Sequence, residues 1–428
     1  MRVLRRDAGL SVTAEQVYST LHRSSADSVW LDSGVDAVDG MSFVAAGTPM
    51  DVADAFATLR ALPRLEEDAA PLGAIGWLGY ELRERTTGVP VARAARYPEA
   101  GMLWVDRGVT IDHATGVVEL VALGRRWTRD LEAWARETIA ALRTPVTVEP
   151  FVAEPAEARW AHTPERYLEM VQACLAAITE GEAYQLCLTT EAAVDVHPDP
   201  LAAYLALRAS SPSHHGALLR IGGISLLSAS PESFLTISRD GLVRSKPIKG
   251  TRPRGATPDS DAAQRVQLLA SDKERAENLM IVDLMRNDIA RIAEVGTVTV
   301  PSLLAVESYR HVHQLVSTVE GRLRPDLDVV DAIEACFPAG SMTGAPKRRA
   351  TEILDALEGR ARGIYSGAFG RLSADGSVDL AMVIRTIVLD GEGATVGTGG
   401  GITALSVPQE ELEETRLKAA ALLRVLGA

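Results

Sequence analysis

The chain has 428 residues, of which 46% are hydrophobic and 24% charged, and its formal net charge at pH 7 is -13. These values are typical of a globular protein of one large or two smaller domains, and the negative charge argues against binding to nucleic acid or to an anionic membrane surface. Three cysteines without paired spacing indicate neither a disulfide framework nor a zinc site. The sequence has no signal-like start and no run of about 18 apolar residues, so it predicts a cytoplasmic protein.

Residues 1–145 alternate short apolar runs with turn signals, which predicts antiparallel strands and a hairpin around residues 114–116. Proline, alanine and glutamate then become frequent without any periodicity, and this change indicates a linker near residues 145–160. We therefore predict two domains, an amino-terminal domain of residues 1–150 and a second domain of residues 151–428.

The second domain begins with a predicted helix from Pro164 to about Glu180 and continues with strand-like and helical segments. The strand-like segments come in pairs and do not alternate regularly with helices, as they would in a doubly wound sheet. The pattern predicts an α+β fold in which large antiparallel β-sheets pack together with helices on the outside. The helical segments are residues 261–292, 328–337, 346–359 and 408–426.

Two of these helices begin with the same arrangement of side chains. Each start has the spacing of a capping box and is followed by two glutamates three residues apart, a spacing that puts both on one helix face. Acidic residues in a first turn also favour the helix dipole, which explains such a pair without any ligand. The boxes are Ser271 with Glu274 and Ser406 with Gln409, and the glutamate pairs are Glu274 with Glu277 and Glu411 with Glu414.

The apolar residues that follow Glu277 favour a binding site over that simpler explanation. Met280, Ile281 and Leu284 continue the helix face of Glu277, which directs its carboxylate toward the interior, where a charge needs a partner. Two such helices facing one another would present the oxygen ligands that Mg²⁺ prefers. The spacing therefore makes Mg²⁺ a candidate cofactor.

Lysine is scarce in this chain, with five residues against thirty-nine arginines. Two of the five, Lys246 and Lys249, lie three residues apart in a turn that contains Pro247 and Gly250. A lysine can lose its proton and act as a nucleophile, whereas an arginine effectively cannot. Lys249 is therefore a candidate nucleophile, and a solvated amine in a rigid loop is the alternative.

Two further features are consistent with an anionic ligand. Arg385 is a charge among the apolar residues of a predicted strand, and it should be either paired or directed at a ligand. The glycines of residues 397–403 match neither a dinucleotide fingerprint nor a phosphate-binding loop. Successive glycines at the end of a strand can still offer backbone N–H groups to a carboxylate.

Six segments of the second domain together resemble the chorismate-utilising enzymes, a family that comprises anthranilate synthase component I, aminodeoxychorismate synthase component I, and the isochorismate and salicylate synthases. The resemblance extends over residues 165–425, and residues 1–150 resemble the amino-terminal domain of the family more loosely. It implies an anthranilate synthase component I-like sandwich and a chorismate-binding catalytic domain over residues 151–428. The segments are SPESF, KPIKGTRPRG, ENLMIVDLMRNDIARI, CFPAGSMTGAPKRRA, GIYSGAFG and GTGGGITALSVPQEELEETRLKA.

The resemblance also implies Mg²⁺-dependent chemistry on chorismate and a role for individual residues. It implies metal-binding carboxylates at Glu277 and Glu414, with Glu274 and Glu411 nearby. It implies that Glu232, in SPESF, is the general acid that protonates the departing hydroxyl. The implied contacts with the substrate are Gly250, Thr251, Tyr365, Arg385, Gly399, Gly400, Gly401 and Lys418.

The PIKGT sequence around Lys249 is similar to that of the aminodeoxychorismate synthases, whereas anthranilate synthases resemble PIAGT. This similarity implies that Lys249 forms a covalent intermediate with chorismate and that ammonia then gives 4-amino-4-deoxychorismate, on the route to p-aminobenzoate and folate. The lysine that activates water in the isochorismate and salicylate synthases falls on Gln185, which cannot act as a base. Gln314 stands where the family usually has a histidine.

No glutaminase motif of the form G-x-C-x-G is present, which implies that a separate glutamine amidotransferase subunit, or ammonia in solution, supplies the nitrogen. Two alternatives stay open. Anthranilate synthase component I would in addition eliminate pyruvate. A ligand sensor on an inactive chorismate fold would lack a metal-binding glutamate or Arg385, and neither is lost here.

Overall fold

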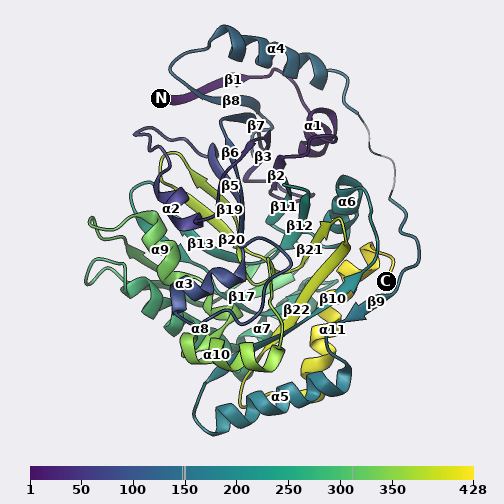
Figure 1. The fold of residues 1–428 in the computed structure, drawn as a ribbon, viewed down its shortest axis with the longest axis vertical. Helices are drawn as coiled ribbons and strands as arrows, with labels where there is room; N and C mark the ends of the chain where they lie inside the picture. The colour runs from purple at the N-terminus through teal and green to yellow at the C-terminus, as the bar shows by residue number, and fades with distance from the viewer. Residues whose placement is uncertain (147, 149–150, 311) are drawn as a thin grey trace.

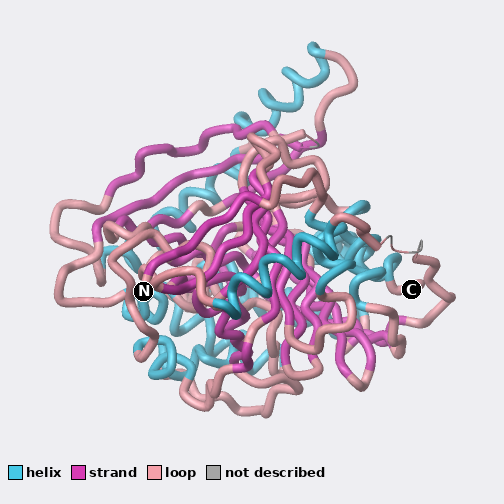
Figure 2. Tube along the Cα trace, turned by 90° about the horizontal axis from the view of Figure 1, so that it is seen from above, coloured by secondary structure: helices cyan, strands magenta, loops and turns pink. Residues whose placement is uncertain are grey.

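The computed structural model describes residues 1–146, 148, 151–310 and 312–428. In these residues the strands occupy the middle of the molecule and the helices lie around them (Figures 1 and 2). The strands form two antiparallel sheets, which confirms the predicted α+β fold. The predicted domain boundary at residue 150 falls outside the described residues, and strands from both sides of it contribute to each sheet.

The larger sheet has twelve strands, and amino-terminal strands continue directly into carboxy-terminal ones. The junction is the pairing of β2 with β11, where Leu31 lies opposite Ala217. In order across the sheet the strands are β1 (Arg2–Asp7), β8 (Val118–Gly124), β7 (Arg107–Asp112), β3 (Met41–Ala46), β2 (Ser28–Asp32), β11 (His215–Ile221), β12 (Ile224–Ser230), β21 (Thr386–Asp390), β22 (Gly393–Ile402), β10 (Gln185–Val194) and β18 (Gly344–Ala345), with β9 (Ala158–Trp160) paired to β10.

The smaller sheet has ten strands and also joins the two halves of the chain, because Trp77 of β5 pairs with Phe369 of β19. The chain crosses between the sheets at six places in the described structure, and the two crossings that matter for the site run from β12 to β13 and from β20 to β21. In order the strands are β15 (Ile248–Pro253), β17 (Val312–Arg322), β14 (Leu242–Ser245), β13 (Ser233–Ile237), β20 (Val378–Met382), β19 (Ala368–Ser373), β5 (Gly73–Leu78), β6 (Ala100–Val105) and β4 (Thr48–Pro49), with β16 (Thr299–Ser308) paired to β17.

Helices cover both sheets. On the larger sheet, Val17 of α1 and Leu422 of α11 pack in one buried cluster with Leu218 of β11. On the smaller sheet, Ile281 of α8 packs in a cluster with Val319 of β17. The helices are α1 (Ala14–Leu21), α2 (Ala55–Arg60), α3 (Arg83–Thr87), α4 (Arg129–Leu142), α5 (Pro164–Thr179), α6 (Pro200–Ser210), α7 (Pro258–Ala270), α8 (Asp272–Ala290), α9 (Val329–Cys336), α10 (Lys347–Glu358) and α11 (Pro408–Val425), with 3-10 turns η1 (Tyr80–Leu82) and η2 (Gly340–Met342).

The two sheets face one another across a buried apolar layer. Val29 and Phe43 of the larger sheet pack there with Ile75 and Trp77 of the smaller sheet. Burial of apolar surface is worth about 25 cal/mol per Å², so this layer holds the sheets together. Among the described residues, none from β15, β17 or β22 belongs to the layer, and the space between these strands is left for polar side chains.

The prediction that Arg385 lies within a strand is wrong. The apolar run around it is divided into β20, which ends at Met382 in the smaller sheet, and β21, which begins at Thr386 in the larger sheet. In the sequence this run looks like one continuous strand, because both halves are apolar and buried. The hydrophobic pattern does not reveal that the chain passes from one sheet to the other between them.

The predicted capping box of Ser406 with Gln409 is also wrong. Val407 is the N-cap of α11, and the Ser406 hydroxyl accepts from the Thr403 N–H at 3.1 Å and donates to Glu411 at 2.7 Å. At the other helix, the Ser271 hydroxyl does accept from the backbone N–H at the third helical position, but the reciprocal half of that box is not made. In the described part of the chain no helix is both long and apolar enough to cross a membrane.

Candidate active site

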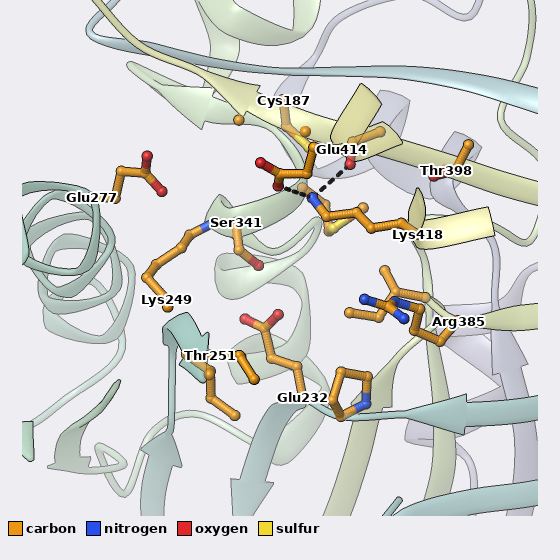
Figure 3. A pocket seen from close by; sticks show the side chains of 18 of the residues that line it. Cys187, Glu232, Lys249, Thr251, Glu277, Ser341, Arg385, Thr398, Glu414 and Lys418 are labelled. Atoms are coloured by element: carbon orange, nitrogen blue, oxygen red, sulfur yellow. Dashed lines mark hydrogen bonds and ion pairs between the residues drawn. The ribbon is translucent and has the colours of Figure 1, made fainter. Parts of the chain in front are cut away.

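A pocket of about 440 Å³ lies between the two sheets, where the chain crosses from one to the other. Its walls come from β22 of the larger sheet, β15 and β17 of the smaller sheet, the two crossings, and the first turns of α8 and α11. All fourteen residues predicted as site residues line this pocket, and Figure 3 shows several of them. The structure therefore brings together every side chain that the sequence singled out, and their roles stay predictions.

Lys249 enters the pocket from an irregularity in β15. Between two pairings with β17, β15 has two residues, Lys249 and Gly250, where β17 has one, Leu315. Such a β-bulge redirects a side chain and is frequent next to active sites. Gly250 has a φ of +88°, and a Cβ there would lie 2.8 Å from the carboxyl carbon of Glu274, so only glycine fits without strain.

The Lys249 amine points into the pocket (Figure 3), and it has no hydrogen-bond or ion-pair partner among the described residues. Figure 3 places Glu277 and Arg385 on opposite sides of the pocket, with Lys249 and Glu232 between them. An unpaired amine in this position is available to react with a molecule that fills the pocket.

Glu232 lies in the crossing from β12 to β13, and its carboxyl lines the pocket. Burial raises the pKa of Glu232 above its ordinary value, although Lys249, a hydrogen bond from Ser341 and the Ile248 N–H act in the opposite direction. A carboxyl with a raised pKa keeps its proton at a higher pH than usual, which is the property that a general acid needs.

The four predicted metal glutamates line the pocket from the first two turns of α8 and α11. Glu277 has no hydrogen-bond or ion-pair partner among the described residues. The other three carboxylates are held by cations, and the shortest distances are 2.7 Å for Glu274 with Arg252, 3.6 Å for Glu411 with Lys273 and 2.7 Å for Glu414 with Lys418.

The pKa values of two of these carboxyls shift in opposite directions. Burial raises the pKa of Glu277 against the opposing positive charges of Lys249 and Lys273, and the negative charges of Glu414 and Glu411 add to the rise. Burial would also raise the pKa of Glu414, but the charge and hydrogen bond of Lys418 hold it below its ordinary value. The two helix ends are therefore close enough for their carboxylates to repel one another.

These carboxylates have the chemistry of a Mg²⁺ site. Mg²⁺ takes oxygen ligands and is usually bound through one or two carboxylates, with water and substrate oxygens completing its coordination. Glu277 and Glu414 supply two carboxylates whose mutual repulsion a divalent cation would relieve. In the described residues no group of three or more His, Cys, Asp or Glu side chains is arranged to hold a metal ion, so the remaining ligands would come from water and substrate.

Arg385 combines strain with an unpaired charge. It adopts a φ of +51°, which is unfavourable for a residue other than glycine, and its guanidinium has no partner among the described residues. Although the side chain is exposed where it lines the pocket, the surrounding protein lowers its pKa, against a smaller opposing effect of Tyr365. Of the two predicted environments, the structure excludes an ion pair among the described residues and places Arg385 in the wall of the pocket, and its contact with a ligand stays a prediction.

The glycines of β22 line the wall next to Lys418. β21 pairs with β22 only as far as Val396, so in the described structure the segment 397–402 has a strand partner on the β10 side alone. The Lys418 amine donates to the Gly399 carbonyl at 3.0 Å. A Cβ at Gly397 would lie 2.1 Å from the Tyr365 ring. This edge therefore leaves backbone N–H groups and a cation beside the space where a carboxylate could bind.

Two glutamines that depart from the family pattern have different positions. Gln314 lines the pocket from β17. Gln185 does not line it, because its side chain lies behind Gly401, where a Cβ would approach the amide nitrogen to 2.8 Å. The nitrogen and oxygen of the Gln185 amide are buried without a hydrogen-bond partner in the described structure.

Among the other residues that line the pocket, four that carry a hydroxyl, amine or thiol group were not assigned from the sequence. Ser341 and Thr398 lie within two of the quoted segments, so the motifs contained them without marking them. Lys273 is one of the five lysines and stands beside the cap of α8, and this scarcity could have indicated it. Cys187 gave no signal, because a single cysteine in a buried strand is usually a small apolar residue.

The comparison with protein families matches residues 13–424 to the family described as chorismate binding enzyme. The aminodeoxychorismate synthase of Streptomyces pristinaespiralis is 46% identical over 369 residues, which are 83% of this chain and 51% of that protein. The aminodeoxychorismate synthase of Streptomyces griseus is 42% identical over 471 aligned residues, which cover 100% of this chain and 64% of that protein. The chain thus spans between half and two thirds of the length of these relatives.

Among solved structures, anthranilate synthase component I from Streptococcus pneumoniae TIGR4 matches with a TM-score of 0.79 and 30% sequence identity. The match covers 92% of this chain and 91% of that one.

Proposed function

The chain belongs to the chorismate binding enzyme family, and we propose that it is the chorismate-converting component of an aminodeoxychorismate synthase. It would replace the C4 hydroxyl of chorismate with an amino group from ammonia, giving 4-amino-4-deoxychorismate for the synthesis of p-aminobenzoate and folate. The observation that carries this proposal is the unpaired amine of Lys249 in the same pocket as Glu232, a carboxyl whose pKa is raised.

Lys249 would act as the nucleophile. Its neutral amine forms a bond to C2 of chorismate, both double bonds of the ring diene shift, and the C4–O bond breaks as the hydroxyl takes the proton of Glu232 and leaves as water. Ammonia then forms a bond to C4, both double bonds shift back, and the bond between C2 and the lysine nitrogen breaks. One proton of the added ammonia returns to Glu232, so the sum exchanges water for ammonia.

Chorismate carries two carboxylates, and the proposed contacts match them. Arg385 offers an unpaired guanidinium on one side of the pocket. The segment from Gly399 to Gly401 and the Lys418 amine offer hydrogen-bond donors along β22. Tyr365 supports this wall with its ring, and Gly250 and Thr251 would contact the substrate ring from the bulge. Charge-assisted hydrogen bonds of this kind fix orientation as well as affinity.

Mg²⁺ is the proposed cofactor. Glu277 and Glu414 would hold it, with Glu274 and Glu411 beside them, and when bound it would supply a Lewis acid to the oxygens of the substrate. Because the Glu414 carboxylate is now paired with Lys418, binding a metal there would release the Lys418 ammonium for a substrate carboxylate.

The proposed source of ammonia is a separate glutamine amidotransferase subunit. The chain has no G-x-C-x-G motif, and its three cysteines are buried. Burial raises the pKa of Cys174 and Cys336 to about 12 and also raises the pKa of Cys187. A thiol that stays protonated is a poor nucleophile, so none of them is suited to release ammonia from glutamine.

The test incubates the purified chain with chorismate, Mg²⁺ and an ammonium salt and identifies the product by mass. We expect 4-amino-4-deoxychorismate with the ammonium salt and no product when glutamine is the only nitrogen source. Glutamine-dependent product from the pure chain would contradict the proposal of a separate amidotransferase. Absence of any aminated product with ammonium would contradict the proposed function itself.

Anthranilate synthase component I is the second candidate, because the likeness in fold to the Streptococcus pneumoniae protein of that name covers most of both chains. This activity would release pyruvate from the aminated ring. The same incubation separates the two functions, since anthranilate and pyruvate would then appear in equal amounts in place of 4-amino-4-deoxychorismate.

A further inference from the structure

The turn that carries Lys249 is anchored by an ion pair outside the pocket. The Lys246 amine lies 2.9 and 3.1 Å from the two carboxylate oxygens of Glu307, and the Tyr309 hydroxyl donates to the same carboxylate at 2.6 Å. Neither Lys246 nor Glu307 lines the pocket, and the reaction described above uses neither of them.

Glu307, Gln314 and Thr251 form a row across three neighbouring strands, at the C-terminal end of the bulge in β15. β16 places Glu307 opposite Gln314 of β17, and β15 places Thr251 opposite the same glutamine. This row fixes the C-terminal side of the bulge at Lys249, while Lys246 precedes the bulge in the chain. The ion pair therefore ties the N-terminal side of the bulge to the row that holds its C-terminal side.

We propose that Glu307 is a positioning residue for the reaction proposed above, on which this inference rests. Through Lys246 it keeps the bulge in the register that directs the Lys249 amine into the pocket. Register matters here because a slip of one residue along a strand turns each side chain to the opposite face. Glu307 also neutralises Lys246, so no second unpaired ammonium stands three residues from the nucleophile.

The exposure of this ion pair separates a positioning role from a structural one. The accessible fraction is 37% for the Lys246 side chain and 33% for that of Glu307, and ion pairs of this kind contribute little to global stability. Loss of the pair should therefore leave the protein folded. A displacement of about 1 Å at the reacting groups can nevertheless lower a rate about 100-fold.

The test compares Glu307→Gln, Lys246→Met and the double variant in the ammonium-dependent reaction, with thermal unfolding as the check on folding. We expect each single variant to lower kcat about 10- to 100-fold and to leave the KM for chorismate within about twofold of wild type. The double variant should be no slower than the slower single variant, because the two side chains act as one unit. Lys246→Arg keeps the ion pair and should retain most of kcat.

Glu320→Gln is the matched control. Arg244 and Glu320 form an ion pair of 2.9 Å between β14 and β17 of the same sheet, away from the bulge, so this variant should keep the kcat of wild type. Wild-type kcat in Glu307→Gln, or an equal loss in Glu320→Gln, would overturn the positioning role while the proposed function stands. If the wild-type chain forms no 4-amino-4-deoxychorismate, the proposed function fails and the positioning role fails with it.

Discussion

Arg385 is the residue whose loss should separate substrate binding from stability. Its side chain lines the pocket without a partner among the described residues, and its φ of +51° is strained. The backbone conformation of Arg385 therefore destabilises the protein without substrate. Strain of this kind persists where a function requires it. We expect the Arg385→Met variant to bind chorismate more weakly without unfolding more easily.

The size of the binding effect follows from the missing contact. A hydrogen bond between a charged donor and its acceptor contributes roughly 1.5–3 kcal/mol, and each 1.36 kcal/mol corresponds to about a factor of ten. The KM for chorismate should therefore rise about 10- to 150-fold in Arg385→Met. Arg385→Gly should raise KM as much, and it should be more stable than Arg385→Met because the left-handed conformation costs a non-glycine residue about 1–2 kcal/mol.

Steady-state kinetics with ammonium and Mg²⁺ measures KM, and thermal unfolding measures stability. Arg362→Met is the control, because the Arg362 guanidinium is buried and pairs with Glu358 at 2.6 Å. Removal of one partner from such a pair costs about 3–5 kcal/mol. An unchanged KM in Arg385→Met would refute the contact with substrate, and a loss of stability as large as that of the control would refute the view that Arg385 is unpaired.

Three further predictions concern the reacting groups. Without ammonia, wild type should form a chorismate adduct that intact-protein mass spectrometry detects, and Lys249→Ala should lose it. Lys249→Arg should also form no adduct, because arginine cannot deprotonate. An active arginine variant without an adduct would make Lys249 a positioning charge. Glu277→Gln and Glu414→Gln should each weaken Mg²⁺ binding in isothermal titration calorimetry, since one carboxylate fewer remains, and wild-type affinity would remove that residue from the site. The rate should fall as pH rises through the raised pKa of Glu232, because only the protonated carboxyl can donate; a Glu232→Gln variant that kept this pH dependence would exclude Glu232 as the acid.

The sequence predicted the pocket better than it predicted the backbone that builds it. Every predicted site residue lines one pocket, because the motifs occupy the ends of elements that the two sheets bring together. The direction of Arg385 could not be predicted, since the crossing between sheets looks like a continuous apolar strand. The partner of Ser406 could not be predicted either, because Gln409 is nearer in sequence than Glu411 and has the spacing of a capping box, whereas the position at which α11 starts selects Glu411.

The bulge at Lys249 shows a different limit of the sequence. A bulge is defined by the register between two strands, and here the facing residue, Leu315, lies 66 positions further along the chain (315 − 249). No periodicity within residues 244–255 contains that information. Gly250 was the local indication, and its φ of +88° shows why a glycine stands there.

The scarcity of lysine drew attention to residues that line the pocket, but the five lysines do not all have the same role. Four of the five lysines make ion pairs that an arginine could also make, whereas the Lys249 amine has no partner in the described structure. A guanidinium could replace the charge at 249 but could not form and then break a bond to carbon, because it does not deprotonate. Thirty-nine of the basic residues in this chain are arginines, but an unpaired lysine stands in the bulge at the centre of the pocket. This choice of residue favours a reaction of the amine at Lys249. The paired lysines are Lys246 with Glu307, Lys273 with Glu411, Lys347 with Asp288 and Lys418 with Glu414, and their presence carries no such implication.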